Sequence, residues 1–127
     1  MIAKMSPSLD SETWRFVAVN RGSAPQLLGA AIATFREAEG VSAIVPAALA
    51  DQLGESGADF QHITFQVSSD LEAAGLTAAV ASALADAGIA CNMVAALYHD
   101  HCFVPATRAQ EALTVLERIS SAARGDD

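Results

Sequence analysis

The stretch that decides the fold begins at residues 68–77 with Ser68-Ser69-Asp70-Leu71-Glu72-Ala73-Ala74-Gly75-Leu76-Thr77, and it ends at residues 98–105 with Tyr98-His99-Asp100-His101-Cys102-Phe103-Val104-Pro105. The pattern between these ends predicts a capped helix start, a long helix, an apolar strand and a tight turn. The polar groups suited to a functional role lie at the two ends of that strand and at the start of that helix.

Hydrophobic spacing places the elements around this stretch. Residues 62–67 alternate apolar and polar side chains, which predicts a strand. Ser69 with Glu72 forms a capping box that opens the helix, and Gly88 ends it. Residues 89–98 are expected to form a strand that turns at His99-Asp100, returns over residues 101–104 and leads into a last helix at Pro105. With that turn, Cys102 faces Leu97, and Cys91 is too far along the strand for a disulfide.

The first half of the chain predicts smaller elements. Residues 1–13 are expected to be an irregular lead-in, and residues 121–127 a frayed tail. The expected elements between them are a strand at 14–20, a loop at 20–25, a strand at 28–36, a turn at 37–40, a strand at 41–45 and a helix at 47–53. Strands with one polar face and helices with one apolar stripe fit an α+β, two-layer sandwich of ferredoxin-like, βαββαβ type.

Composition excludes several classes of function. The chain has 127 residues, 52% of them apolar, which is enough for one core, and its net charge of −8 disfavours nucleic acid and anionic membrane surfaces as partners. No apolar run is long enough for a membrane span or a secretory signal. Two cysteines are too few for a disulfide framework, so a cytoplasmic protein with reduced thiols is expected.

The predicted helix start is a candidate ligand site. Free backbone N–H groups there favour an anion, and Gly75 lets a ligand approach the backbone. Asp70 and Glu72 suit an ammonium group, so the combination fits a zwitterion such as a free amino acid. Asn92 can both donate and accept hydrogen bonds, so it could bind either the carboxylate or the ammonium group of that ligand. The alternatives are a self-capped helix and an edge asparagine bonded to water.

The second candidate is the trio His99, Asp100 and His101. Histidine and aspartate are common ligands of zinc and iron, and His62 on another strand could be a third ligand side chain. The alternative is a hairpin turn in which Asp100 bonds backbone amides. No catalytic triad, phosphate loop or dinucleotide fingerprint is present, and we expect no catalytic residue and no cofactor.

Three stretches of the chain, taken in order, resemble the sequences of small bacterial proteins that contain two ACT domains. They are Phe35-Arg36-Glu37-Ala38-Glu39-Gly40-Val41-Ser42, the stretch Ser69 to Ala78, and Tyr98 to Pro105. The resemblance covers roughly residues 12–120. It implies an abbreviated ACT-like half at residues 1–59, an ACT domain at residues 60–127, and regulatory binding of an amino acid without catalysis.

The resemblance also implies where the ligand binds, namely between the loop that opens the helix and the following strand. The residues it selects are Ser69, Asp70, Gly75, Leu76, Thr77, Asn92, Met93 and Val94. The sequence departs from its relatives at Asp70, which stands in a run that usually lacks it, and at Leu97, where an aromatic residue is frequent. A final ACT strand is also missing, so an N-terminal strand or a partner must complete the sheet, and we expect a homodimer.

These features predict a regulatory protein that binds a small molecule, an amino acid, and changes its association with a partner. Two alternatives belong to other classes. One is a metal-binding protein or metal-dependent enzyme that uses His99, Asp100 and His101. The other is a dimerisation module without a ligand.

Overall fold

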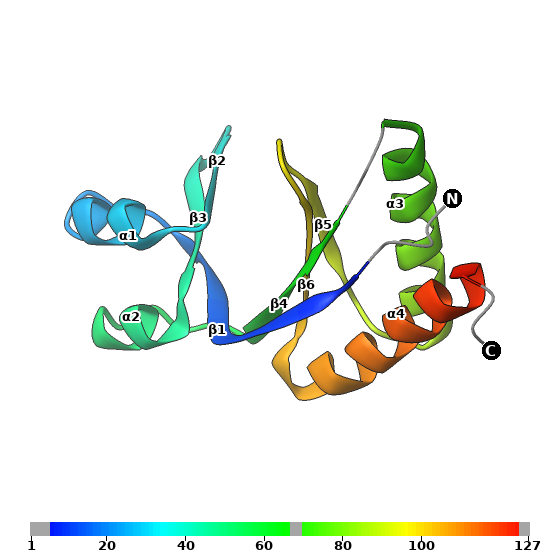
Figure 1. The fold of residues 1–127 in the computed structure, drawn as a ribbon. Coiled ribbons are helices and arrows are strands. Elements are labelled where there is room, and N and C mark those ends of the chain that lie inside the picture. The colour runs from blue at the N-terminus through cyan, green and yellow to red at the C-terminus, as the bar shows by residue number, and fades with distance from the viewer. Residues whose placement is uncertain (1–5, 67–69, 125–127) are drawn as a thin grey trace. The chain divides into compact units, whose positions relative to one another are not determined.

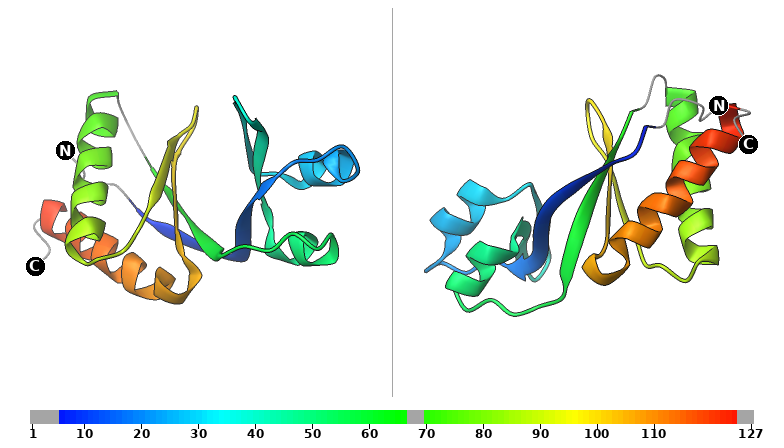
Figure 2. Two further views of the ribbon diagram at one scale, coloured as in Figure 1. Left: turned by 180° about the vertical axis from the view of Figure 1, so that it is seen from behind. Right: turned by 60° about the horizontal axis from the view of Figure 1, so that its bottom comes forward.

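The computed structural model describes residues 6–66 and 70–124, and it divides the chain into two compact units. Residues Glu12–Phe60 form one, which we call the inserted unit. The chain before Glu12 and after Phe60 forms the other, which we call the main unit. Figure 1 shows the elements of both, and Figure 2 gives two further views.

The chain contains six strands, four α-helices and one 3₁₀ turn within the described residues. They are β1 (Ser8–Ala18), α1 (Ala24–Ala30), β2 (Ala33–Glu37), β3 (Gly40–Pro46), α2 (Ala47–Gln52), β4 (Asp59–Phe65), α3 (Asp70–Asp86), β5 (Asn92–Ala95), β6 (Asp100–Pro105), a 3₁₀ turn (Ala106–Arg108) and α4 (Ala109–Arg124). The hydrogen-bonded strand order is β2-β3-β1-β4-β6-β5, so both β1 and β4 run from one unit into the other.

The inserted unit packs two short helices against one face of its strands. β1 pairs antiparallel with β3, and β3 pairs antiparallel with β2. Its core contains apolar residues of β1, β3 and both helices: Val17, Leu27, Ala43, Val45 and Ala50. Gly54 follows α2 with a φ of +74°, a conformation that glycine adopts at little cost, and it ends this helix.

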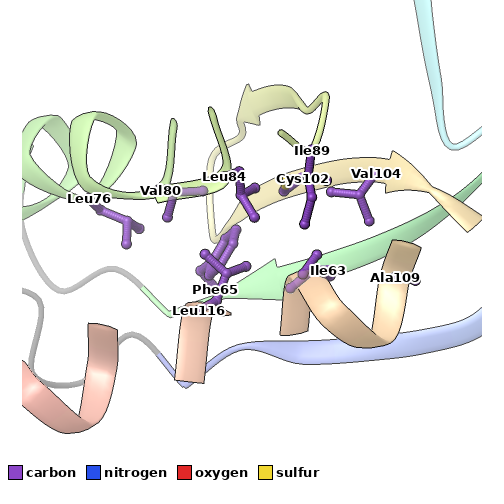
Figure 3. Packing of buried hydrophobic residues seen from close by; sticks show 11 residues of the cluster. Ile63, Phe65, Leu76, Val80, Leu84, Ile89, Cys102, Val104, Ala109 and Leu116 are labelled. Carbon is purple, nitrogen blue, oxygen red and sulfur yellow. The ribbon is translucent and has the colours of Figure 1, made fainter. Parts of the chain in front are cut away.

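The main unit packs α3 and α4 against one face of its strands. The largest core of the protein lies in this layer: Ile63, Phe65, Leu76, Val80, Leu84, Ile89, Cys102, Val104, Ala109, Ala112 and Leu116. Figure 3 shows these side chains between the helices and the sheet. The helical spacing of Leu76, Val80 and Leu84 and the two-residue spacing of Ile63 and Phe65 both follow from burial on one face. This confirms the predicted α+β, ferredoxin-like fold.

The open edge of the main unit is filled by residues that the sequence did not place in a strand. β1 already begins at Ser8, and it neighbours β4 in the strand order. The Gln61 amide donates a hydrogen bond to the backbone oxygen of Asp10, and Leu9 packs against the core. The expected irregular lead-in over residues 1–13 is therefore wrong for residues 8–13. This N-terminal strand takes the place of the missing last strand.

Two other local expectations are wrong. The strand expected over residues 28–36 begins only at Ala33. α1 covers Ala24–Ala30 instead, because Pro25 starts this helix and Leu27 gives it one buried side chain. Residues 121–124 belong to α4 rather than to a frayed tail. The hairpin of β2 and β3, whose strands meet at Glu37 and Gly40, is confirmed.

The second hairpin turns earlier than expected. Asn92 pairs with Phe103, Met93 with Cys102, and Ala95 with Asp100. The turn thus falls on residues 96–99, which the Ala96 N–H closes by donating to the backbone oxygen of His99 at 3.1 Å. Cys102 therefore faces Met93 and not Leu97.

The new register also brings the two cysteines together. The thiol of Cys91 lies close enough to Cys102 to interact with it, so their expected separation is wrong, although both are free thiols.

Candidate ligand-binding site

The start of α3 is the centre of the site that the sequence proposes. α3 begins at Asp70, but Ser69 and the side chain of Asp70 lie outside the described residues, as does the expected capping box. Gly75 is exposed, and a Cβ atom added to it would meet nothing within 4 Å beyond its own helix. Leu76 is buried in the core and Thr77 is exposed. The surface beside Gly75 therefore offers open space, as a ligand needs.

The strand residues of the proposed site lie on two faces. Met93 packs against the core under α3 and α4, and its partner Cys102 belongs to that core. Asn92 and Val94 lie on the opposite face, because side chains alternate along a strand and Val94 pairs with His101. The structure thus brings Leu76 and Met93 to the helix-covered layer and separates them from Asn92 and Val94.

The two ends of β5 also differ in their distance from the start of α3. In Figure 1 the turn between β5 and β6 lies at the same end of the main unit as the start of α3. Ala95 and Asp100 flank this turn, whereas Asn92 lies three residues away, about 10 Å along the strand. Asn92 therefore lies at the end of β5 away from this turn.

Asp100 is a buried polar residue in the strand that follows the turn. It is the first residue of β6, and only 4% of it is exposed. Its Oδ2 and the neighbouring Nδ1 of His99 are buried, and no described residue forms a hydrogen bond with either atom. The expected turn in which Asp100 bonds backbone amides is wrong in its position, because Asp100 lies in the strand after the turn.

His101 contacts a histidine from the neighbouring strand. Its Nδ1 lies 2.8 Å from Nε2 of His62, and the two rings stack with their centroids 5.0 Å apart. Burial and then the nearby His101 lower the pKa of His62, and Asp10 opposes this. Burial and then His99 lower the pKa of His101, and Asp100 opposes this.

The histidines do not form a metal centre with Asp100. His101 and Asp100 are neighbours in a strand, so their side chains point to opposite faces. Within residues 6–66 and 70–124, no group of three histidine, cysteine or acidic side chains is placed to hold a metal ion. The part of the metal hypothesis that has geometric support is the proximity of His62 and His101.

Family comparisons can now be set beside this geometry. One sequence model of the ACT domain matches residues 1–60, and another matches residues 57–118. The chain belongs to the ACT-domain family. ACT domains are regulatory modules, and the family supports a regulatory role in which a small molecule binds. No match was found among curated proteins.

Solved structures agree with the ACT fold over nearly the whole chain. A Vibrio cholerae protein of unknown function, described as a possible transport protein, is 43% identical over 94% of this chain and 92% of its own, with a TM-score of 0.82. A protein of Agrobacterium tumefaciens is 15% identical over 92% and 90%, with a TM-score of 0.72. The ligand-free regulatory subunit of aspartate kinase from Thermus thermophilus is 13% identical over 91% and 97%, with a TM-score of 0.65. The last two show likeness of fold alone.

Sequence reasoning missed the main charged cluster of the first ACT match. Arg15 is 7% exposed and bonds Asp51 at 2.7 Å, Asp59 at 2.7 Å and the backbone oxygen of Glu55 at 2.8 Å. Arg15, Asp51 and Glu55 border an open depression of about 390 Å³. Since the guanidinium is already paired with two carboxylates, the cluster stabilises the inserted unit rather than offering a free cation. The arginine inside an alternating strand was the only signal in the sequence.

The described helices add one fact about membranes. Within the described residues, no helix is both long and apolar enough to cross a lipid bilayer.

Proposed function

We propose that this protein is a non-catalytic regulatory ACT protein that binds an amino acid. The observation that carries the proposal is the pair of ACT-domain matches, which follow one another over residues 1–118. The regulatory subunit of aspartate kinase from Thermus thermophilus shares the fold, which supports a regulatory role. We place the boundary between the two ACT domains near residue 60, where the two matches meet.

The proposed site lies at the start of α3, in the second ACT match. The first turn of this 17-residue helix has backbone N–H groups without helical partners, which suit a carboxylate. Gly75 leaves the surface beside this turn open. The proposed ligand contacts at this end of the helix are Ser69, Asp70, Gly75, Leu76 and Thr77, with Met93 of β5 on the same side of the sheet. Asn92 and Val94, which lie on the other face of β5, are proposed contacts only for a ligand bound at the edge of that strand.

The same proposal includes a homodimer in the cytoplasm. β5 is the last strand in the sheet order, and it is followed by Leu97 and Tyr98, which are 86% and 81% exposed. Residues 89–99 contain no acidic, lysine or arginine side chain, so two copies of a chain with net charge −8 can meet there without repulsion between carboxylates. The two free thiols fit a reducing compartment.

Thermal unfolding against a panel of L-amino acids tests the ligand. A ligand at about 100 times its dissociation constant adds about 2.7 kcal/mol to stability, which raises the midpoint by several degrees for a domain of this size. We expect one amino acid or one chemically related group to raise the midpoint. A panel in which every amino acid leaves the midpoint unchanged contradicts the proposal.

Two substitutions then locate the site. Gly75→Trp fills the open space beside the first turns of α3, and Asn92→Ala removes the polar group at the far end of β5. Loss of the ligand-induced shift in Gly75→Trp, but not in Gly75→Ala, assigns the ligand to the start of α3. Loss in Asn92→Ala alone assigns it to the exposed edge of β5. An unchanged shift in all three variants removes this site.

A further inference from the structure

The two cysteines of the chain come together on the helix-covered side of the main unit. Cys91 directly precedes β5, and Cys102 is the third residue of β6. Met93 pairs with Cys102, and Cys91 lies two residues before Met93, so the two cysteines are diagonal neighbours on one face of this strand pair. Cys102 belongs to the core that Figure 3 shows, and Cys91 packs against the same core. The register of β5 and β6 therefore places both thiols in one layer.

The two cysteine side chains are in direct contact. Burial and then the neighbouring Cys91 raise the pKa of Cys102, and the contribution of Cys91 includes a hydrogen bond between the two side chains. A hydrogen bond that raises the pKa favours the protonated form, so the Cys102 thiol donates and the Cys91 sulfur accepts. Thiols in such contact need only a small movement to form a disulfide. Cys91 precedes the paired residues of β5, so this movement does not break the pairing of β5 with β6.

The two thiols differ in their access to solvent. Cys91 is partly exposed, whereas Cys102 is completely buried, so a small oxidant in solvent meets Cys91 first. The chain contains two cysteines in all, so the thiol within reach of an oxidised Cys91 is that of Cys102. An accessible cysteine beside a second cysteine that can react with its oxidised form is a common arrangement in proteins that respond to oxidants.

We propose that Cys91 and Cys102 are a site of reversible oxidation by hydrogen peroxide, which converts the two thiols into an intramolecular disulfide. In the first step the Cys91 thiolate attacks one oxygen of the peroxide, the O–O bond breaks, and Cys91 becomes a sulfenic acid while hydroxide leaves. In the second step the Cys102 sulfur attacks the Cys91 sulfur, and the S–O bond breaks. The departing hydroxide takes the Cys102 proton and leaves as water. Overall, the two thiols lose two electrons and two protons, and the peroxide is reduced to two molecules of water.

The disulfide fastens the edge strand of the sheet. β5 is the last strand in the sheet order, and its neighbour there is β6. A bond from Cys91 to Cys102 ties the start of β5 to β6 and limits the opening of this edge. Because the two positions are diagonal rather than directly opposite, the bond departs from the preferred disulfide geometry, and such bonds are reduced more readily. The oxidation is therefore reversed by a monothiol such as glutathione. This inference goes beyond the proposed function and does not depend on it.

Treatment of the reduced full-length protein with hydrogen peroxide tests the proposal. Thiols are then counted in denaturant, the intact mass is measured, and the chain is run on a gel without reductant. We expect both thiols to disappear together, the mass to fall by two hydrogen atoms, and the chain to run as a monomer. Excess reduced glutathione should restore both thiols. Loss of one thiol alone, addition of oxygen atoms to the mass, disulfide-linked dimers, or a disulfide that glutathione leaves intact would each contradict the proposal.

Two variants identify the order of the steps. In Cys102→Ala the reaction should stop at the sulfenic acid of Cys91, which a 1,3-dione reagent traps. In Cys91→Ser the buried Cys102 should stay reduced under conditions that oxidise the wild type completely. If Cys102 of this variant is oxidised as fast as in the wild type, Cys91 is not the first site and the proposal is wrong. Amide hydrogen exchange of Met93 and Val94 in the wild type should slow on oxidation, and unchanged exchange would show that the bond does not fasten β5. The wild-type measurements decide the proposal even if Cys102→Ala fails to fold.

Discussion

His62 Nε2 and His101 Nδ1 lie 2.8 Å apart, so the two imidazoles share one hydrogen-bonding proton when both are neutral. A second proton would place two positive charges side by side. His62 is almost completely buried against this partner and stacks on Phe103, with ring centroids 4.8 Å apart. Protonation of both histidines should therefore destabilise the folded state.

The stability of the main unit should fall as the pH drops below about 6.5, the usual pKa of histidine. Both pKa values are lowered in the folded state, which means that the unfolded chain binds protons more readily. The contribution of the pair is complete above the unfolded pKa and is lost as the pH falls toward the folded values. Urea unfolding at pH 7.5 and pH 5.0 measures the loss. A His101→Asn variant should show a smaller difference between the two pH values, and an equal difference would contradict this role.

Arg15 should contribute strongly to the stability of the inserted unit. Arg15→Met removes the bonds to Asp51, Asp59 and the Glu55 backbone oxygen together. Asp51→Asn removes only one charged partner, whose side chain is 70% exposed, and exposed ion pairs contribute little. In urea unfolding, Arg15→Met should lower the midpoint clearly more than Asp51→Asn does. Equal midpoints for the two variants would show that the cluster is not structural.

Two glycines of α3 should respond in opposite directions to the same substitution. Gly75 lies within the helix with open space around it, so Gly75→Ala should stabilise the protein by about 0.5–1 kcal/mol. Gly88 follows the helix with a φ of +72°, which costs a residue with a Cβ atom about 1 kcal/mol, so Gly88→Ala should destabilise it. Both values come from one set of denaturation curves. A loss of stability in Gly75→Ala would indicate a neighbour that fills this space.

The two thiols should react at different rates. Cys102 is completely buried, and burial followed by the nearby Cys91 raises the pKa of its thiol, so little thiolate forms. Cys91 is partly exposed. A chromogenic thiol reagent should modify one cysteine of the folded protein quickly and the second only after denaturant is added. Cys91→Ser should remove the fast phase, and its persistence would mean that Cys102 is accessible.

The elements that the sequence predicts well are those whose pattern reports a single buried face. The stripe of Leu76, Val80 and Leu84 and the glycine at position 88 fix α3 without tertiary information. The β2–β3 hairpin is equally clear, because Gly40 adopts a φ of +142° beside its turn. In contrast, Ser8 to Thr13 form a strand only because β4 and the core beneath Leu9 are available, and no local pattern reveals this.

The candidate site was harder to predict than the fold, because its geometry depends on register. Shifting the turn to residues 96–99 moves Asp100 from the turn into the strand and turns it toward the helices. The same register places Asn92 at the far end of β5. A shift of one or two residues thus changes which polar side chain can meet a ligand, while the hydrophobic pattern that specifies the fold is hardly affected. The contact between His62 and His101 depends on the pairing of two strands far apart in sequence. The sequence suggested it only indirectly, through His62 as a possible third metal ligand.

The path of β1 has a consequence for how the protein is made. Ser8–Ser11 leave the ribosome before the inserted unit, but β4, the strand beside which they lie, begins almost fifty residues later. The nascent chain can form the inserted unit early, whereas the main unit must wait until α4 has been synthesised. Its sheet then closes around a long intervening segment, which slows folding more than it lowers stability. During that interval the first residues of β1 are an unpaired strand end, and the stretch of synthesis between residue 61 and α4 is when the chain most needs protection from other chains.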